Sequence, residues 1–506
     1  MLSKNQSIDP RLVPLVVASG LFVALVYITY LSGVALTGGT FVYSLDDPYI
    51  HLTVARRIVS GEYGFNPGEF AAPCSSILWP FLLAPFVALG VGELAPFALN
   101  LLCAGGVLWV AFRLLAPKGP AATVFFAAFV VLVNLSGLCF QGMEHLLQLW
   151  LTLAAVLGLV RLEEEGAPPR WLAPVLILGP LVRFENLLAS GLAILWLLYR
   201  RRIGSAALAA AGIAVGLGVF VLFLKAHGFG PLPNSVAAKA ALTGNATPLV
   251  ALTDNFLRNL RHTEAIPCGV AALLLAGLAL TRSGRPPFER ALAALGSLLL
   301  IAQLVGGAVM FSRYEAYAWG TALVLLGRLT AGRARLWRVA LWAPALCGHV
   351  YVLHTLAAAP GMLGIYEQQF QMSRLVAECW RRPVALNDIG LVGWRGGNYV
   401  LDLFGLVQTE SLRAFRERRD PEWMTPLVRK NRVGMAAVYE TWYLRKPTGW
   451  VKVGTLVTSR DNVYLGGNAV GIWATSPEEV PAVRAALEKL APTLPTKVTL
   501  EWEPTP

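Results

Sequence analysis

The chain has 506 residues, of which 56% are hydrophobic and only 14% are charged, and its mean hydropathy is +0.58. Its repeated apolar runs of about 20 residues exclude an ordinary soluble protein and predict a polytopic α-helical membrane protein. The net charge of +12 does not indicate nucleic-acid binding, because the arginines fall in short loops between apolar runs, as the positive-inside rule expects.

The first predicted element is a membrane helix over residues 12–36. Its apolar run of about 25 residues is too long for the core of a signal peptide, so we expect a retained helix. The tail before it carries Lys4 and Arg11. Because basic segments stay in the cytoplasm, we expect this tail to be cytoplasmic and the loop after the helix to be external.

Residues 45–70 follow this helix and begin with two adjacent carboxylates, Asp46 and Asp47. A carboxylate misplaced in lipid costs roughly 2.5–3.5 kcal/mol, so the pair needs water, a metal ion or a partner. The apolar residues after the pair recur on one stripe of an amphipathic helix, at Ile50, Val54 and Ile58. Asn-Pro-Gly at 66–68 then predicts a turn. The alternative is a solvated loop that only caps the first helix.

The interpretation of residues 75–90 determines on which side of the membrane each later loop is predicted to lie. This run is apolar, but it has only about 16 residues and contains two prolines, so we expect an interfacial or re-entrant helix. Every arginine-rich short loop then falls on the cytoplasmic side, whereas a full span here would invert all later loops. About eleven spans result. Those after the first are expected at residues 94–115, 121–138, 146–162, 171–181, 187–198, 206–224, 265–280, 291–311, 319–326 and 339–356, with a polar external connection at 225–264.

The composition changes at about Pro360, where long apolar runs end and charged residues become frequent. Short strands are predicted at 384–386, 399–403, 433–439 and 463–465, and helices at 374–381 and 477–490. We therefore expect a membrane domain over residues 1–358, with an external catalytic loop at 44–74, and an external α/β domain over residues 360–506.

The unusual polar groups of the membrane part all fall at expected external helix ends. They are Asp46, Asp47, His51, Glu144, His145, Arg183, Glu185, His227, Asn234, Lys239, Arg313, Tyr314 and Glu315. Snorkelling and interfacial anchoring explain single Arg, Lys and Tyr residues. They explain adjacent acids and the Glu144–His145 pair less well, so we expect a functional external cavity.

Such a cavity suits group transfer from a lipid phosphate. A carboxylate at the water boundary can take a proton from an incoming hydroxyl group. Adjacent carboxylates can also hold a divalent metal ion, although no spacing here is specific enough to name one. Lys239 and Arg313 can bind the phosphate. An apolar groove between spans would hold the lipid tail.

Several segments carry a resemblance to a known family, in chain order and over about four fifths of the chain. They are DDPYIHLTVARRIVSG with FNPGE (46–69), QGMEH (141–145), LVRFE (181–185), FGPLPNSVAAKA (229–240), NDIGLVGW (387–394) and VLDLFGL (400–406). With these segments the chain resembles the membrane-embedded GT-C glycosyltransferases. The resemblance is closest to bacterial members such as the terminal arabinofuranosyltransferases of mycobacterial cell walls.

The resemblance implies a GT-C-like fold and inverting transfer of a sugar from a polyprenyl-phosphate donor. The sugar would be arabinofuranose or another pentose or hexose, and the acceptor a glycan, lipid or protein of the cell envelope. The implied location is the bacterial inner membrane, among membrane lipids, with the active site and the C-terminal domain on the periplasmic side. Asp46 would be the general base, and Asp47 would support it or contact metal or sugar.

The resemblance also implies binding roles. Lys239 would meet the donor phosphate, and the other donor phosphate or sugar contacts would be Arg313, Asn234, Arg183, Glu185 and His145. Asp47 and Glu144 would contact a divalent metal ion, Mg²⁺, Mn²⁺ or Ca²⁺. Asn387 and Asp388 would either reach over the cavity or form a turn. Departures from the family pattern at Pro48, at residues 70–79 and at Phe184 leave the sugar open.

Other classes of function remain as alternatives. A flippase or transporter of lipid-linked sugars would show inverted repeats and charges at the bilayer midplane, neither of which the sequence shows. A non-catalytic envelope assembly protein would use the external domain as a binding module and would not need Asp46 and Asp47. Another lipid-phosphate group transfer would need a Ser or Thr nucleophile beside a metal cluster, which Thr53 does not provide.

Overall fold

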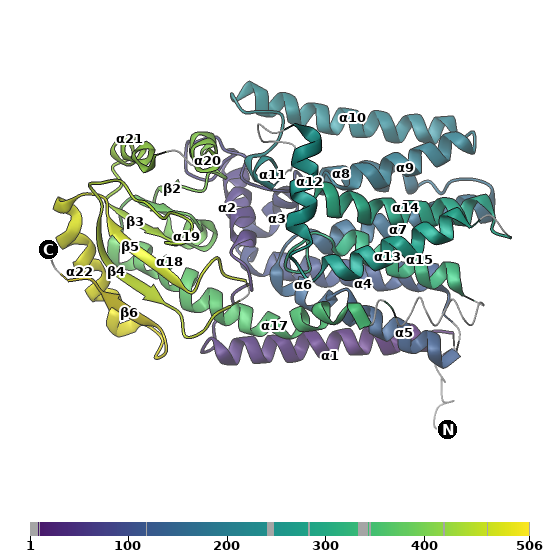
Figure 1. Cartoon of the computed structure of the whole chain (residues 1–506), viewed down its shortest axis with the longest axis horizontal. Helices are drawn as coiled ribbons and strands as arrows, with labels where there is room; N and C mark the ends of the chain where they lie inside the picture. The colour runs from purple at the N-terminus through teal and green to yellow at the C-terminus, as the bar shows by residue number, and fades with distance from the viewer. Residues whose placement is uncertain are drawn as a thin grey trace.

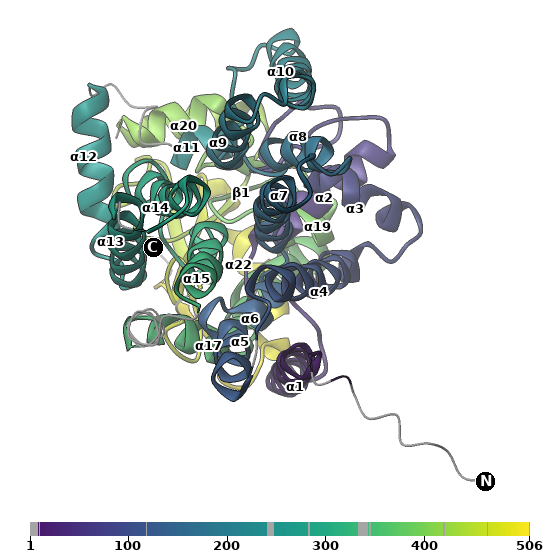
Figure 2. The same ribbon diagram turned by 90° about the vertical axis from the view of Figure 1, so that its right-hand side faces the viewer.

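The chain, seen in a computed structural model, forms a bundle of helices with a β-sheet region at one end (Figure 1). The structure describes residue 9 and residues 11–117, 119–239, 247–281, 284–331, 343, 346–417, 420–462 and 464–504. Most bundle helices run along one axis, and Figure 2 shows many of them end-on. We call the bundle end beside the sheet the sheet end, and the opposite end the basic end.

The helices of the bundle follow the expected chain order of apolar segments. They are α1 (Val13–Leu36), α2 (Asp47–Val59), α3 (Trp79–Ala88), η1 (Gly92–Leu94), α4 (Ala95–Leu115), α5 (Gly119–Leu132), α6 (Leu135–Gln141), α7 (His145–Glu165), α8 (Leu172–Val182), α9 (Asn186–Tyr199), α10 (Ile203–Ala226), α11 (Asn234–Lys239), α12 (Pro248–Asn259), α13 (Ala265–Leu280), α14 (Pro287–Gly306), α15 (Ala316–Thr330) and α17 (His349–Ile365). The predicted polar connection at 225–264 contains the helices α11 and α12. The last predicted span, 339–356, lies partly outside the described residues, and α17 covers its end.

Several helices present bare apolar faces. The apolar stretch of α1 has a mean hydropathy of 2.1 and is only 11% buried inside the protein, and the corresponding values for α10 are 2.5 and 22%. Val23 on α1 is 62% exposed and Leu222 on α10 is 68% exposed. Leaving such faces in water costs roughly 25 cal/mol per Å² of apolar surface, so they need a lipid environment. The chain is a helical membrane protein.

Six helical segments in the described residues are long and apolar enough to cross a membrane, namely 13–36, 92–115, 119–141, 145–165, 203–226 and 287–306. The predicted count of eleven spans stays a prediction. The expected half-length pair is present as α8 and α9. With 11 residues, α8 is about 16 Å long, roughly half the thickness of a bilayer core. The turn between α8 and α9 carries the polar residues Arg183 and Glu185.

The arginine-rich loops come together at the basic end, as the charge pattern predicts. Arg200, after α9, lies 3.2 Å from Glu163 of α7. Arg328, near the end of α15, lies 3.5 Å from Glu164 and donates to the carbonyl of Leu114 at the end of α4. These contacts place the loops of four helices on the same side of the bundle.

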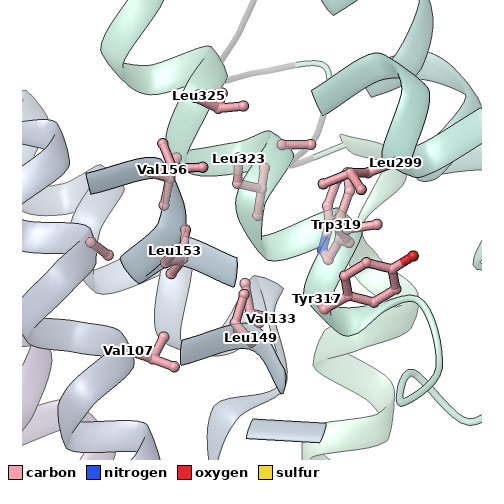
Figure 3. Packing of buried hydrophobic residues seen from close by; sticks show 14 of the residues in the cluster. Val107, Val133, Leu149, Leu153, Val156, Leu299, Tyr317, Trp319, Leu323 and Leu325 are labelled. Carbon is pink, nitrogen blue, oxygen red and sulfur yellow. The ribbon is translucent and has the colours of Figure 1, made fainter. Parts of the chain in front are cut away.

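Packing in the bundle is dense around α15, whose residues from Ala316 to Leu326 are all buried. Trp319 stacks on Tyr351 of α17 with ring centroids 5.2 Å apart and donates its indole N–H to the carbonyl of Leu132. Figure 3 shows Trp319 and Leu323 facing side chains of α7, including Leu149. This core holds the sheet end of α15, and with it Arg313, in place.

The sheet region contains β1 (Val384–Leu386), α19 (Gly390–Gly396), β2 (Val400–Asp402), α20 (Thr409–Arg416), η5 (Pro421–Trp423), α21 (Met424–Lys430), β3 (Met435–Val438), β4 (Val451–Val457), β5 (Ala469–Ala474), η6 (Pro477–Glu479), α22 (Val480–Leu490), η7 (Ala491–Thr493) and β6 (Thr499–Trp502). The six strands lie in the order β2-β1-β3-β5-β4-β6. β1 pairs in parallel with β2 and β3, and the other pairs are antiparallel. The mixed sheet has α22 on one face, which confirms the expected α/β composition.

Two details of the predicted C-terminal part differ from the structure. The strand expected at 463–465 is wrong, because Tyr464 and Leu465 form a turn and a bend before β5. The boundary predicted at 358–360 stays a prediction, but it falls inside α17. That helix continues through η3 (Tyr366–Phe370), α18 (Gln371–Arg374) and η4 (Leu375–Trp380), so a continuous helical segment joins the bundle to the sheet region.

The predicted amphipathic helix is α2, and it lies between the bundle and the sheet region (Figure 1). Ile50 and Val54 pack in the apolar cluster of the sheet region, as their stripe predicted. Leu52, on another face, packs against Trp79 and Leu83 of α3. Contacts on both sides therefore fix α2, and with it the two carboxylates at its N-terminus.

Candidate functional site

Asp46 connects the first loop to the sheet region. Its two carboxylate oxygens accept hydrogen bonds from the backbone N–H groups of Gly390 (2.6 Å) and Leu391 (2.8 Å), the first residues of α19. This is the capping interaction of a helix N-terminus, supplied from a residue more than 300 positions away. Glycine is required at 390, because a Cβ there would overlap the carbonyl oxygen of Asp46.

A second carboxylate, Asp388, lies beside Asp46. It accepts hydrogen bonds from the hydroxyl of Tyr439 (2.8 Å) and the amide of Gln369 (3.0 Å). Burial raises the pKa of Asp46 above its usual range, and the nearby negative charge of Asp388 adds to the rise, while the two backbone N–H groups oppose it. Burial also raises the pKa of Asp388. The two carboxylates therefore share a proton more readily than isolated aspartates do.

Asp47 points in a different direction from Asp46. Its Oδ2 lies 2.5 Å from Nη1 of Arg313, and 28% of its side chain is exposed, whereas Arg313 is only 5% exposed. The guanidinium of Arg313 also lies 4.5 Å from the ring centre of Tyr314. Both aspartates are half-buried, but Asp47 faces a buried cation, whereas Asp46 faces backbone N–H groups.

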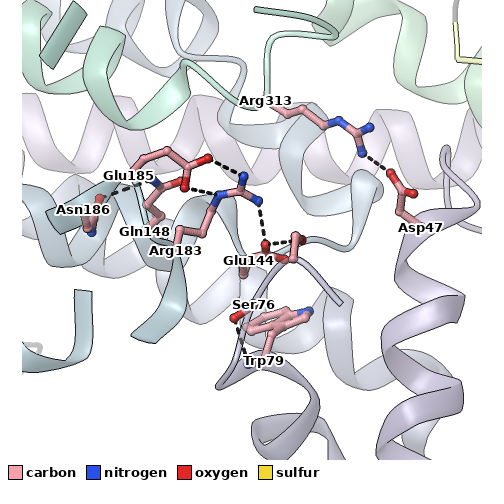
Figure 4. A network of polar contacts seen from close by, with 10 residues as sticks. Asp47, Ser76, Trp79, Glu144, Gln148, Arg183, Glu185, Asn186 and Arg313 are labelled. Carbon is pink, nitrogen blue, oxygen red and sulfur yellow. Dashed lines mark hydrogen bonds and ion pairs between the residues drawn. The ribbon is translucent and has the colours of Figure 1, made fainter. Parts of the chain in front are cut away.

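A second arginine–carboxylate cluster lies beside the first, as Figure 4 shows. Nη1 of Arg183 lies 2.8 Å from Glu144, and Nη2 and Nε of Arg183 form a fork on Glu185 at 2.7 and 3.1 Å. Ser75 donates its hydroxyl to Glu144 at 2.9 Å. Although burial raises the pKa of Glu144, the positive charges of His51, Arg183 and His145 lower it to about 2. Glu144 is therefore a buried anion, and its Oε2 has no hydrogen-bond partner among the described residues.

Local backbone geometry brings Glu144 to this cluster. Gly142 ends α6 with a φ of 67°, and a Cβ there would come within 2.7 Å of the ring of Tyr43. The chain can turn sharply here only with glycine, and the turn places Glu144 at the start of α7. The α8–α9 turn supplies Arg183 and Glu185 from the other side, and the N–H of Leu78 donates to the carbonyl of Leu181 to hold that turn.

A cavity of about 370 Å³ opens beside Arg183, and Tyr314, whose ring lies against both arginines, is also part of its lining. Its polar lining comes from Ser75, Arg183, Glu185, Ser235, Gln303, Tyr314 and Tyr317, and its apolar lining includes Leu187, Leu188 and Ala302. A larger cavity of about 860 Å³ lies at the basic end, where its charged lining residues Glu164 and Arg328 pair with each other. The smaller cavity is the one that adjoins the predicted polar cluster.

The structure brings most of the predicted site residues together. Asp47, Glu144, Arg183, Glu185 and Arg313 form the two ion-paired clusters, and the ring of His145 lies 5.4 Å from that of Tyr314. Two predicted residues are placed differently, and a third side chain is not described. Asn234 bonds to Thr409 of α20, His227 stacks on Phe70, and the side chain of Lys239 lies outside the described part of the chain. Sequence reasoning missed Ser75, because a pair of serines at the start of an apolar run gives no signal.

The described residues do not fit the predicted divalent metal ion well. No group of three or more His, Cys, Asp or Glu side chains converges in the described part of the chain. Asp47 and Glu144 each face an arginine, which already supplies the positive charge that a metal ion would bring. The metal ion stays a prediction, and no chemical step below depends on it.

Comparisons with known proteins were made for the whole chain. A family model described as a domain of unknown function, DUF8728, matches residues 361–473, which is well under half of the chain. No curated protein matches the sequence. Among solved structures, the crystal structure of ArnT from Cupriavidus metallidurans in the apo state aligns over 91% of this chain and 99% of that chain, with 13% identity and a TM-score of 0.41. A likeness of that size carries no argument about activity.

Fold and site together define a class of protein. It is a polytopic helical membrane protein with a C-terminal sheet region and a buried, charged cluster where the two meet.

Proposed function

We propose that the protein is an integral-membrane glycosyltransferase, which moves a sugar from a polyprenyl-phosphate donor to a cell-envelope acceptor with inversion at the anomeric carbon. One observation carries the proposal. Two buried arginines, Arg183 and Arg313, flank Tyr314 beside a cavity at one end of an apolar bundle, and each faces a carboxylate. This arrangement combines an anion site with a proton acceptor next to lipid-facing helices.

Arg183 and Arg313 are the proposed phosphate ligands. A guanidinium presents a rigid fork of N–H donors that matches a phosphate, and it stays charged when buried. Removing two cations from water is costly unless anions neutralise them, and Glu144, Glu185 and Asp47 do so in the absence of donor. A phosphate that enters the cavity would compete with these carboxylates. Lys239 and Asn234 remain proposed additional donor contacts.

The apolar side of the cavity suits a lipid tail. Leu187 and Leu188 of α9 and Ala302 of α14 line it, and Leu187 is 41% exposed on the outside of the bundle. Ile301 on α14 is 44% exposed. The apolar part of the lining therefore lies close to surface that needs lipid, which suits a polyprenyl chain.

Asp47 is the proposed general base. The oxygen of an acceptor hydroxyl group attacks the anomeric carbon of the sugar, the bond from that carbon to the phosphate oxygen breaks, and the hydroxyl proton passes to Asp47. The negative charge that develops on the leaving phosphate is stabilised by the arginines. Phosphate binding at Arg313 would loosen its pairing with Asp47. Asp46, whose oxygens are held by α19, is proposed to position this segment.

The sugar itself is proposed to lie between the phosphate ligands and the sheet region. The unpaired oxygen of Glu144, together with Glu185 and His145, offers acceptors and donors for sugar hydroxyl groups. Arabinofuranose, another pentose or a hexose would each find such partners. The proposed location is the bacterial inner membrane, with this site on the periplasmic side.

The test is transfer of labelled sugar from a panel of polyprenyl-phosphate sugars by the full-length protein in nanodiscs, with envelope extract as acceptor. Wild-type protein should consume one donor of the panel, and Asp47→Asn at matched expression should lose about 10²-fold or more in kcat, as expected for removal of a general base. The matched control is Glu93→Gln, which removes a carboxylate near the sheet end that lies 4.0 Å from the exposed Arg395. If no donor is consumed with any acceptor fraction, the flippase and assembly-protein alternatives gain support.

A further inference from the structure

A second cavity lies in the sheet region, away from the charged cluster. Its volume is about 900 Å³, at the upper end of the range of about 300–1,000 Å³ that small-molecule sites occupy. It lies between α20, η5 and the connection from β3 to β4. Its aromatic lining residues are Phe404, Phe415, Trp423, Trp442 and Tyr443, and we call this set the aromatic cleft.

The aromatic cleft is built from rings that pack against one another. Phe404 lies 5.1 Å from Phe415 and 5.5 Å from Trp442, and Phe415 lies 5.4 Å from Tyr443, measured between ring centroids. Tyr443 is 5% exposed, and its hydroxyl has no hydrogen-bond partner among the described residues. The Tyr443 ring is therefore held by packing against its neighbours and forms a fixed wall of the cleft.

The rim of the cleft is polar. Arg416, Asp420, Thr441 and Arg445 line it, and all four residues are exposed. Sugar rings match such a surface, because their C–H faces carry slight positive charge that favours the negative face of an aromatic ring, while their hydroxyl groups bond to charged and polar side chains. A lipid tail would leave the charged rim unsatisfied. The rim therefore favours a carbohydrate.

Packed side chains link the walls of the cleft to the candidate site. Trp442 packs on Tyr439 with centroids 5.3 Å apart, and the Tyr439 hydroxyl donates to Asp388, the neighbour of Asp46. On its other side, α20 contacts α11, where Thr409 bonds to Asn234 and Arg416 donates to the carbonyl of Ala237. Figures 1 and 2 both show α20 beside α11. These contacts join both walls of the cleft to elements that carry residues of the candidate site.

We infer that the aromatic cleft binds a glycan chain of the cell envelope, whose end is the acceptor in the proposed transfer. The acceptor role in this inference rests on the proposed function. The binding of a glycan in the cleft does not depend on it. It makes the sheet region an acceptor-binding module and assigns the substrate class as a glycan rather than a lipid or protein.

The test measures binding and transfer on the same preparations. Short oligosaccharides released by mild acid from purified bacterial envelope polysaccharide are immobilised on a sensor, and full-length protein in nanodiscs is passed over them. Trp442→Ala should weaken binding about tenfold, as loss of an aromatic contact at the centre of a site does. Arg445→Ala, an exposed change that leaves the fold intact, should weaken it severalfold. Trp442→Phe should restore part of the affinity.

The matched control is Trp502→Ala, which removes a 40% exposed tryptophan from β6 at the far edge of the sheet and should leave binding within about twofold of wild type. Glycan binding that depends on Trp442 and Arg445, but without transfer from any donor, would support the cleft and contradict the proposed function. Donor turnover with no glycan binding, or with binding unchanged in both cleft variants, would overturn the inference and leave the proposed function standing.

Discussion

At the scale of single residues, Asp46 and Asp47 are neighbours in sequence with different surroundings. Asp46 accepts two backbone N–H groups of α19, whereas Asp47 meets a buried arginine and solvent. The family resemblance assigns the base to Asp46, and the hydrogen bonds of Asp46 favour a positioning role instead. The two carboxylates can therefore be separated by experiment.

Asp46→Asn should lower the apparent unfolding temperature, because an amide keeps only one acceptor oxygen and turns its NH₂ group toward a backbone N–H. A buried hydrogen bond contributes about 0.5–1.5 kcal/mol. The loss in kcat should be smaller than that of Asp47→Asn. Unfolding temperature and kcat are measured on the same nanodisc samples. An unchanged unfolding temperature together with abolished turnover would instead make Asp46 the base.

The Asp46–Asp388 pair predicts how stability depends on pH. Both carboxylates have a pKa raised by burial, so between about pH 4 and the raised values the folded protein binds more protons than the unfolded chain does. Their stabilising contribution is present at acid pH and is lost as the pH rises. From pH 5 to pH 8 the wild-type protein should lose about 2 °C or more of unfolding temperature beyond the loss in Asp388→Asn. An identical pH dependence of the two proteins would contradict the pairing.

At the scale of elements, three side chains of residues 46–66 attach α2 and its following loop to the sheet region. Asp46 caps the start of α19, Arg56 donates to the carbonyls of Gly393 and Trp394, and Asn66 bonds to both backbone groups of Val400 on the edge strand β2. These contacts cover a free sheet edge and both ends of a short helix. The segment that carries the proposed base is thus fixed by the sheet region.

Gly390→Ala tests this attachment. The added Cβ would overlap the carbonyl oxygen of Asp46, so α19 has to move away from α2. We expect a loss of about 1–3 kcal/mol in stability together with reduced turnover. Gly396→Ala is the control on the same helix, since its Cβ would meet Val376 at an ordinary distance of 3.5 Å. Equal unfolding temperatures for the two variants would show that the contact with Asp46 is not tight.

The sequence predicts elements better than it predicts their contacts. Long apolar runs and the half-length pair of α8 and α9 are visible because their length and composition are local properties. The strands β4 and β5 are not visible in the sequence, because Gly454 and Gly471 interrupt their alternating patterns. The strand β6 is not visible either, because it is short and exposed. The ion pair of Asp47 with Arg313 joins residues 266 positions apart, so no local pattern encodes it. The family resemblance identified the polar turns, but the contacts between their side chains are visible only in the structure.

At the scale of the whole molecule, the bundle has a basic end and a sheet end. The positive-inside rule predicts that the basic end is cytoplasmic and that the sheet region is on the other side. This orientation decides whether a periplasmic glycan can reach the aromatic cleft. The orientation is a property of the protein in its own membrane, so it needs a test in intact cells.

Two single cysteines report the orientation, in a background in which Cys347 and Cys379, the two cysteines that are not fully buried, are serines. Lys430→Cys, at the exposed end of α21, should react with a membrane-impermeant maleimide in spheroplasts. Ala167→Cys, in the exposed loop after α7, should react only after permeabilisation. The reverse pattern would place the proposed site on the cytoplasmic side and exclude an external acceptor.

The central claim is that Arg183 and Arg313 hold the phosphate of a lipid-linked donor. The most direct test is a cryo-electron-microscopy structure of the protein in nanodiscs with bound polyprenyl phosphate. The account predicts phosphate oxygens within about 3 Å of both guanidinium groups, with the prenyl chain along α9 and α14. A phosphate bound elsewhere, such as the cavity at the basic end, with both arginines still paired to their carboxylates, would contradict the account.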